Sequence, residues 1–113
     1  MDLSQLIEIQ SAFDKSHAGL EPFFVPISSS NPRDLEHLIV CMCGELGEFA
    51  NVTKKIVRGD LTFEAAGPML REELTDIFIY LLKVAGQTGI DLEKSYLEKL
   101  EKNKVRFAKW SLP

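Results

Sequence analysis

Apolar residues recur every three to four positions along most of this chain, and no segment alternates in the manner of a half-buried β-strand. The pattern predicts a first helix over about residues 3–17 and a second from Pro32 or Asp34 to Val57. A third helix contains LREELTDIFIYLLKVAG and stops near Gly86, and a fourth contains LEKSYLEKLEKNKVRFAKW. The fold class that we expect is therefore all-α, with four helices.

Capping residues indicate where these helices begin. Ser30 or Asn31 suits the start of the second helix, and Asp91 suits the start of the fourth. The third helix has two candidate starts, since Thr62 is a good cap whereas the Gly67–Pro68 pair marks a later start or a kink. Between the first two helices, AGLEPFFVPISSSNP predicts a long loop, which is uncommon in a small domain and often functional.

Length and charge restrict the class of protein. With 113 residues, we expect one domain over 1–113, made of a helix at 1–17, a loop at 18–31 and a core at 32–107. The net charge of −4 argues against a nucleic-acid polymer as partner, because such a partner needs a basic surface. No signal peptide and no apolar stretch of about 20 residues is present, so we expect no membrane contact. Cys41 and Cys43 would project from nearly opposite sides of a helix, and we expect two buried free thiols in a reducing cytoplasm.

Two carboxylates interrupt the most apolar part of the second helix, where GELGEFA contains Glu45 and Glu48. Each helical residue advances about 100°. This rotation places Glu45 inside the apolar stripe, between Val52 and Leu38, and Glu48 at the edge of the stripe. A buried carboxylate is costly unless it is paired, protonated or bound to a cation.

The third helix repeats this arrangement with Glu73 and Asp76, which share a face with Tyr80 and Lys83. If the two helices pack antiparallel, four carboxylates converge, and they cannot all stay ionised without cations. Mg²⁺, or Mn²⁺ in its place, is the natural partner of such oxygen ligands. A separate apolar stripe of the third helix is expected to form the core: Leu70, Leu74, Ile77, Leu81 and Val84.

Some residues of the predicted helices do not fit a single hydrophobic core. Asn103 falls within the apolar stripe of the fourth helix, where it is either a satisfied core residue or a polar group directed into a pocket. Val40, Ile79 and Leu82 lie off the core stripes of their helices. A helix that is apolar nearly all round is buried on several sides, so we expect a subunit interface.

The ordered set PRDLEHLIVCMCGELGE, REELTDIFIYLL and KNKVRF, over residues 32–107, resembles the MazG-like superfamily of all-α nucleoside triphosphate pyrophosphohydrolases. It is most similar to the dCTP pyrophosphatase branch. The resemblance implies a four-helix bundle completed by oligomerisation, with a homotetramer favoured over a dimer. It also implies Mg²⁺-dependent hydrolysis of a (deoxy)nucleoside triphosphate to monophosphate and pyrophosphate, in house-cleaning or pool control, with a dCTP-like pyrimidine favoured.

The same resemblance implies roles for individual residues. The metal ligands would be Glu45, Glu48, Glu73 and Asp76. Glu48 is our choice for the catalytic carboxylate that activates a water. Of the substrate-binding residues, the resemblance places Tyr80 in the nucleotide pocket and puts Lys102, Asn103 and Arg106 near the substrate. Phe24 and Arg33 are candidates from a loop that does not match the family residue by residue, and Lys83 could supply a cationic contact.

Two other protein classes would use these acids differently. A di-iron carboxylate bundle needs Glu-x-x-His pairs, and neither Asp-x-x-His pair of this chain adjoins the acidic pairs. A non-enzymatic helical interaction module would place the acids in salt bridges with Lys54, Lys55 and Lys83. That module predicts that Glu45→Gln changes stability alone.

Overall fold

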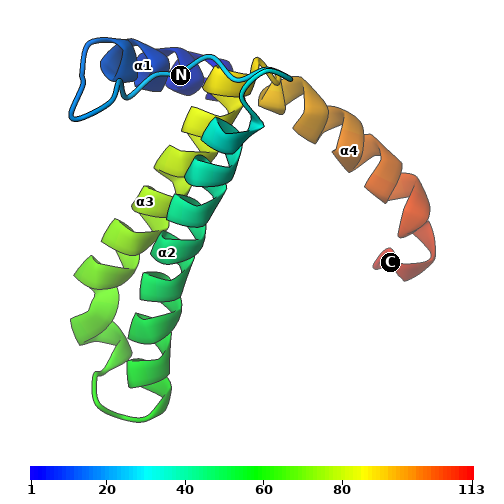
Figure 1. The fold of residues 1–113 in the computed structure, drawn as a ribbon. Helices are drawn as coiled ribbons and strands as arrows, with labels where there is room; N and C mark the ends of the chain where they lie inside the picture. The colour runs from blue at the N-terminus through cyan, green and yellow to red at the C-terminus, as the bar shows by residue number, and fades with distance from the viewer.

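The computed structural model describes all residues 1–113 and contains four α-helices, one short 3₁₀ helix and no strand (Figure 1). The expected all-α chain with four helices is confirmed. No helix combines the length and the apolar character that crossing a membrane requires. The elements are α1 (Leu3–Lys15), α2 (Pro32–Val57), α3 (Phe63–Thr88), α4 (Leu92–Arg106) and the 3₁₀ helix Ala108–Trp110.

The start of α3 is fixed by Thr62, whose side chain accepts a hydrogen bond from the Ala65 backbone N–H. Pro68 lies inside this helix and is not its start. At the other end, α3 continues beyond the expected stop to Thr88 and ends at Gly89, whose φ of 73° is left-handed. The fourth helix is shorter than expected, since α4 ends at Arg106.

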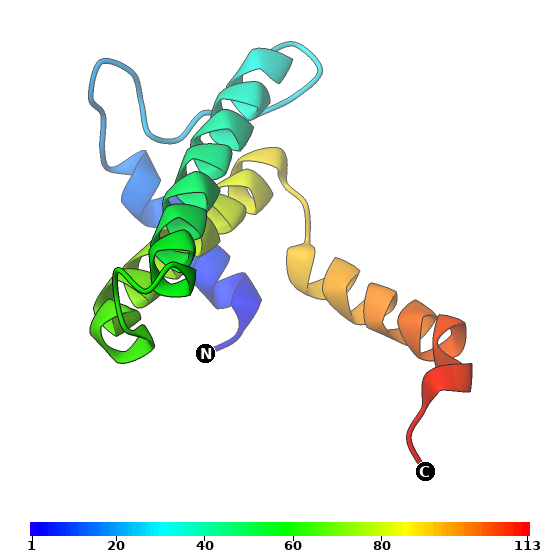
Figure 2. The same ribbon diagram turned by 90° about the horizontal axis from the view of Figure 1, so that it is seen from below.

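The helices are arranged as an antiparallel hairpin with two attachments. In Figures 1 and 2, α2 and α3 lie side by side over most of their length, and α1 crosses one end of the hairpin against α3. Gly86 permits this crossing, because a Cβ there would collide with the Ser11 Oγ of α1. By contrast, α4 extends away from the hairpin, and its main contacts are with α1 and the 3₁₀ helix. The expected four-helix bundle is therefore not closed within one chain.

A single chain buries little of its apolar surface. The buried apolar residues are only Leu38, Val52, Ala66, Leu82 and Ala85. A folded monomer of 12.7 kDa is expected to expose about 6,200 Å², whereas this chain exposes 8535 Å². Its radius of gyration is 17.5 Å, against about 13 Å for a compact domain of this length.

The core stripe that we predicted on α3 is wrong for the single chain. Leu74 is 57% exposed and Leu81 is 41% exposed, and with Ile77 and Phe78 they line a surface groove. Leu82, which we placed off the stripe, is buried instead. Helical periodicity identifies apolar faces, but it does not say which face meets the rest of the chain.

The cysteines also differ from the expectation. Both thiols are free, as predicted, but Cys41 is only half-buried and Cys43 is exposed. Because the apolar segment around them is one wall of a two-helix hairpin, one side of it stays open to solvent.

Candidate metal centre and adjoining cavity

Three carboxylates meet where α2 packs against α3. Glu45 comes from α2, and Glu73 and Asp76 come from α3. One ligand oxygen from each residue lies within 4.8 Å of the others, and all three side chains are half-buried. The i, i+3 spacing puts the two α3 acids on one face, and antiparallel packing brings Glu45 opposite them.

This cluster fits a hard divalent cation. The Oε2 atoms of Glu45 and Glu73 are buried and have no hydrogen-bond partner. A buried carboxylate oxygen without a donor is costly, and a cation removes that cost. Ligands on opposite sides of one Mg²⁺ are about 4.2 Å apart, since each Mg–O bond is 2.0–2.1 Å. The limit of 4.8 Å within which the three ligand oxygens lie is close to this value, so the cluster is of the right size for one ion.

The electrostatics of the cluster match this interpretation. Burial raises the pKa of Glu73 most, to about 7 from 4.5, and the neighbouring carboxyl groups of Glu48, Glu45 and Asp76 add to the effect. Burial, followed by the charges of Glu48 and Asp76, also raises the pKa of Glu45. Without a cation the site therefore retains protons at a pH where ordinary carboxylates have lost them.

Glu48 lies beside this cluster and not within it. Its side chain is exposed, and its charge contributes to the raised pKa values of Glu45 and Glu73. None of the four acids forms an ion pair with a basic residue. This finding argues against the interaction module, in which Lys54, Lys55 and Lys83 would neutralise the acids.

A cavity of about 330 Å³ adjoins the cluster through Tyr80. Tyr80 lines the cavity, and its pKa is raised by burial first, and then by Cys41, Glu45 and Asp76. The remaining wall is formed by the loop after α1, the first turns of α2 and the last turns of α3. Its polar and charged lining residues are Glu21, Asp34, His37, Tyr80, Lys83 and Gln87.

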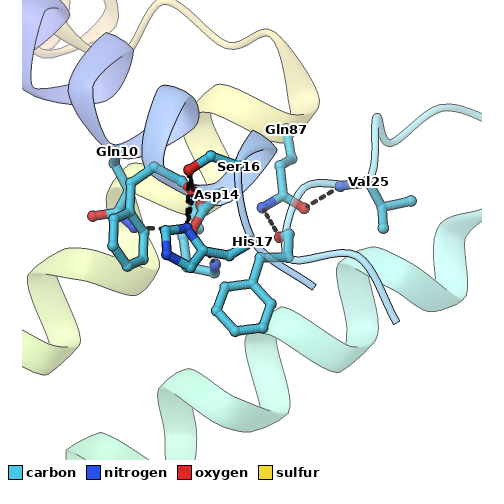
Figure 3. Close-up of polar contacts among 9 residues, drawn as sticks. Gln10, Asp14, Ser16, His17, Val25 and Gln87 are labelled. Atoms are coloured by element: carbon cyan, nitrogen blue, oxygen red, sulfur yellow. Dashed lines mark hydrogen bonds and ion pairs between the residues drawn. The ribbon is translucent and has the colours of Figure 1, made fainter. Parts of the chain in front are cut away.

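Sequence analysis missed two buried polar residues that hold lining residues of this cavity in place. Asp14 is 1% exposed, and its Oδ1 atom accepts from Lys83 Nζ at 2.9 Å and from Gln10 Nε2 at 3.0 Å. Gln87 donates to the Phe23 carbonyl at 3.2 Å and accepts from the Val25 N–H at 3.3 Å (Figure 3). A signal for Asp14 was present, because it lies seven residues after Ile7 and so on the apolar face of α1.

The predicted substrate residues are only partly brought together. Tyr80 and Lys83 line the cavity. Phe24 does not, because it packs under the Lys15 ammonium at 4.7 Å in a separate depression, and its neighbour Phe23 lines the cavity instead. Arg33 is exposed and lies outside the cavity lining.

The predicted substrate residues of the fourth helix are remote from the acids in the single chain. Lys102, Asn103 and Arg106 lie on α4, which does not pack against the α2–α3 hairpin. Asn103 is half-buried. It is neither a core residue nor a pocket residue of the α2–α3 hairpin of its own chain.

The chain is similar in sequence to curated proteins named dCTP pyrophosphatase 1. The Homo sapiens protein is 31% identical over 75 residues, which are 63% of this chain and 44% of the relative. The Bos taurus and Rattus norvegicus proteins are 32% and 29% identical over the same shares of the two chains. The match thus spans less than half the length of these relatives. No protein-family model matches the chain, and no solved structure matches it.

Proposed function

We propose that this protein hydrolyses (deoxy)nucleoside triphosphates to nucleoside monophosphate and pyrophosphate with Mg²⁺, and that a dCTP-like pyrimidine nucleotide is favoured. The main support is the three-carboxylate cluster, in which two buried oxygens have no hydrogen-bond partner, next to a cavity of about 330 Å³. The similarity to proteins named dCTP pyrophosphatase 1 supports the same reaction and suggests the base. The biological role would be house-cleaning or control of nucleotide pools.

In this proposal Glu45, Glu73 and Asp76 bind the cation. Glu48, at the edge of the cluster, is the fourth carboxylate of the ligand set. Bound Mg²⁺, or Mn²⁺, would neutralise the triphosphate and polarise the phosphorus under attack. The buried Oε2 atoms of Glu45 and Glu73 are shielded from water, which strengthens their electrostatic interaction with a cation.

The proposed reaction is an in-line displacement at the α-phosphorus. A water oxygen forms the new bond to phosphorus, and the bond from phosphorus to the α,β-bridging oxygen breaks. Glu48 accepts the proton of the attacking water, because it is the exposed carboxylate of the group and is free to act as a base. Pyrophosphate leaves with the electron pair of the broken bond, and Tyr80 lines the nucleotide side of the site.

We also propose that the functional unit is a homo-oligomer, with a tetramer favoured over a dimer. The large exposed area and the apolar groove of α3 support this proposal. Lys102, Asn103 and Arg106 would then reach the substrate from a second copy, since α4 extends away from the hairpin of its own chain. Obligate homodimer interfaces commonly bury 2,000 Å² or more in total over both partners, and the excess of about 2,300 Å² on each chain is more than enough for such an interface.

One assay tests the reaction. Purified protein is incubated with each of the common ribo- and deoxyribonucleoside triphosphates and Mg²⁺, and the products are separated by ion-exchange chromatography. We expect equimolar monophosphate and pyrophosphate, and loss of turnover in EDTA. Release of single phosphate, or no turnover on any nucleotide, would show that the proposal is wrong.

A further inference from the structure

Both buried polar residues of this chain are connected to the cavity beside the acidic cluster, since Gln87 lines it and Asp14 forms an ion pair with the lining residue Lys83. Only seven residues are buried, and the polar ones among them are Asp14 and Gln87. Gln87 holds the loop that forms one wall, while Asp14 holds Lys83, whose side chain is only 13% exposed. Burying polar groups costs free energy, and here both buried groups fix the position of residues that line the cavity.

Lys83 is poorly placed to contact the reacting phosphate. It lies seven residues after Asp76 on α3, which at 1.5 Å per residue is about 10 Å further along the helix axis. Leu38 and His37, which line the same cavity from α2, are displaced from Glu45 by a similar distance. This distance is comparable to the reach of a nucleoside from its 5′-phosphate to its base.

The charge around Lys83 also disfavours a phosphate. Asp14 neutralises the ammonium at 2.9 Å, and Glu21 and Asp34 add two acidic groups to the lining. Lys83 is the only cationic side chain there other than a protonated His37. A multiply charged anion would be repelled, whereas a neutral polar group would be accepted.

Lys83 nevertheless has hydrogen-bonding capacity to offer. An ammonium has three donors, and the only hydrogen-bonding or ionic partner of Lys83 in the chain is Asp14 Oδ1. Its Nζ also lies 5.7 Å from the centre of the Phe23 ring, so the ammonium is directed toward the aromatic wall of the cavity. A flat base that packs on this wall would find a strong donor at its edge.

We propose that Lys83, held in place by Asp14, donates a hydrogen bond to a carbonyl oxygen of the nucleobase and so selects carbonyl-bearing bases over adenine. Lys83 is then a specificity-determining residue, and Asp14 is a positioning residue that acts through it. The inference rests on the proposed function for the identity of the ligand as a nucleotide. Adenine lacks a carbonyl group, whereas cytosine presents one.

Kinetics on the full-length protein test this inference with dCTP and dATP. We expect Lys83→Met to lower kcat/KM for dCTP by at least about tenfold, mainly through KM, and to change that for dATP little. Lys83→Arg should keep part of the preference for dCTP over dATP, because it keeps a cationic donor. Asp14→Asn should weaken this preference, because the Lys83 ammonium loses its ion-pair partner. Lys94→Met, at a lysine side chain that is 71% exposed on α4, is the matched control and should behave as the parent protein.

Removing one partner of a buried pair can destabilise the protein, so the double variant Asp14→Asn/Lys83→Met is included. It removes both charges at nearly constant volume, and thermal unfolding reports whether it folds. If this folded variant still prefers dCTP as strongly as the parent, the pair is structural only and the inference is wrong. The inference is also wrong if Lys83→Met lowers kcat equally for both nucleotides, because the lysine then acts on the triphosphate.

Binding of unphosphorylated nucleosides separates this inference from the proposed reaction. Titration of the metal-free protein with deoxycytidine should shift the side-chain amide NMR signals of Gln87, and deoxyadenosine should shift them less. If the protein hydrolyses no nucleotide but binds deoxycytidine through Lys83, the reaction is wrong and the inference stands. If it hydrolyses dCTP but neither nucleoside binding nor base preference depends on Lys83, the reaction stands and the inference is wrong.

Discussion

Glu45 and Glu73 each place one carboxylate oxygen where the chain supplies no donor to meet it. Replacing either residue with glutamine removes a negative charge from the cluster and also removes a cation ligand. We expect Glu45→Gln to lower Mg²⁺-dependent kcat/KM by about 100-fold or more, while the melting temperature in EDTA rises. Opposite changes in activity and stability are typical of a functional site that is strained for its task.

The matched control for this variant is Glu72→Gln, on the same helix as Glu73 but exposed. It makes the same chemical change outside the cluster and should alter neither property. Equal effects of Glu45→Gln and Glu72→Gln would remove the support for a metal centre at Glu45.

The pKa of about 7 at Glu73 predicts how stability depends on pH. The folded protein binds this proton more tightly than the unfolded chain, whose carboxyl titrates near 4.5. The stabilisation that this proton gives to the folded state is therefore complete below about pH 4.5, and it is lost as pH rises through about 7. In EDTA we expect the melting temperature to fall between pH 5 and 8, as measured by calorimetry.

Saturating Mg²⁺ should reverse this trend, because the ion binds the deprotonated cluster and its affinity rises with pH. Glu73→Gln serves as the comparison, since it has no proton to lose at that position. A parent protein and Glu73→Gln with the same pH profile in EDTA would contradict the assignment of this titration to Glu73.

Individual residues also show where inference from the sequence succeeds. Glu45 was predicted beside the core, because its wheel neighbours are apolar, and it is half-buried there. The partners of Asp14 and Gln87 were not predictable, because they depend on how α1 and the loop after it dock against α3. Helical periodicity contains no information on docking between elements that are distant in sequence.

At the scale of elements, the cap at Thr62 decided between two possible starts of α3. Thr62→Ala removes the acceptor of the Ala65 N–H and should destabilise the protein by about 1 kcal/mol in urea unfolding. The first turn of α3 lies far from Glu73, so kcat should not change for the folded fraction. Thr62→Ser keeps the acceptor and should retain most of the stability, and a loss as large as that of Thr62→Ala would contradict this role of the hydroxyl.

Most helix boundaries followed from the sequence, because capping and glycine effects are local. Asp91 accepts from the Lys94 N–H as its position before α4 predicts, and Pro32 begins α2. Asn31 differs in detail, since it makes no capping bond to α2 and instead ties the preceding loop through the Ser28 N–H and the Pro26 carbonyl. Several local hydrogen bonds compete for such a side chain, and the sequence does not rank them.

At the scale of the whole molecule, the chain exposes far more surface than its mass requires. The excess over a folded monomer is about 2,300 Å², and part of it is the groove formed by Leu74, Ile77, Phe78 and Leu81. The sequence predicted the apolar face of α3 correctly, but it assigned that face to the core of the single chain, where the structure leaves it exposed. Whether an apolar face meets its own chain or another copy depends on the tertiary arrangement, which periodicity does not specify.

This exposure predicts that the protein is not monomeric in solution. Sedimentation velocity should give a dimer or a tetramer, and Leu81→Asp should shift the population toward monomer, because it places a charge in the groove. Ser29→Asp adds the same charge at an exposed loop position and should leave the assembly intact. If the proposed trans contribution of α4 also holds, Leu81→Asp lowers kcat/KM although every carboxylate is retained. A Leu81→Asp protein that is monomeric but fully active would show that one chain contains the complete site, and a monomeric parent would remove the interface proposal altogether.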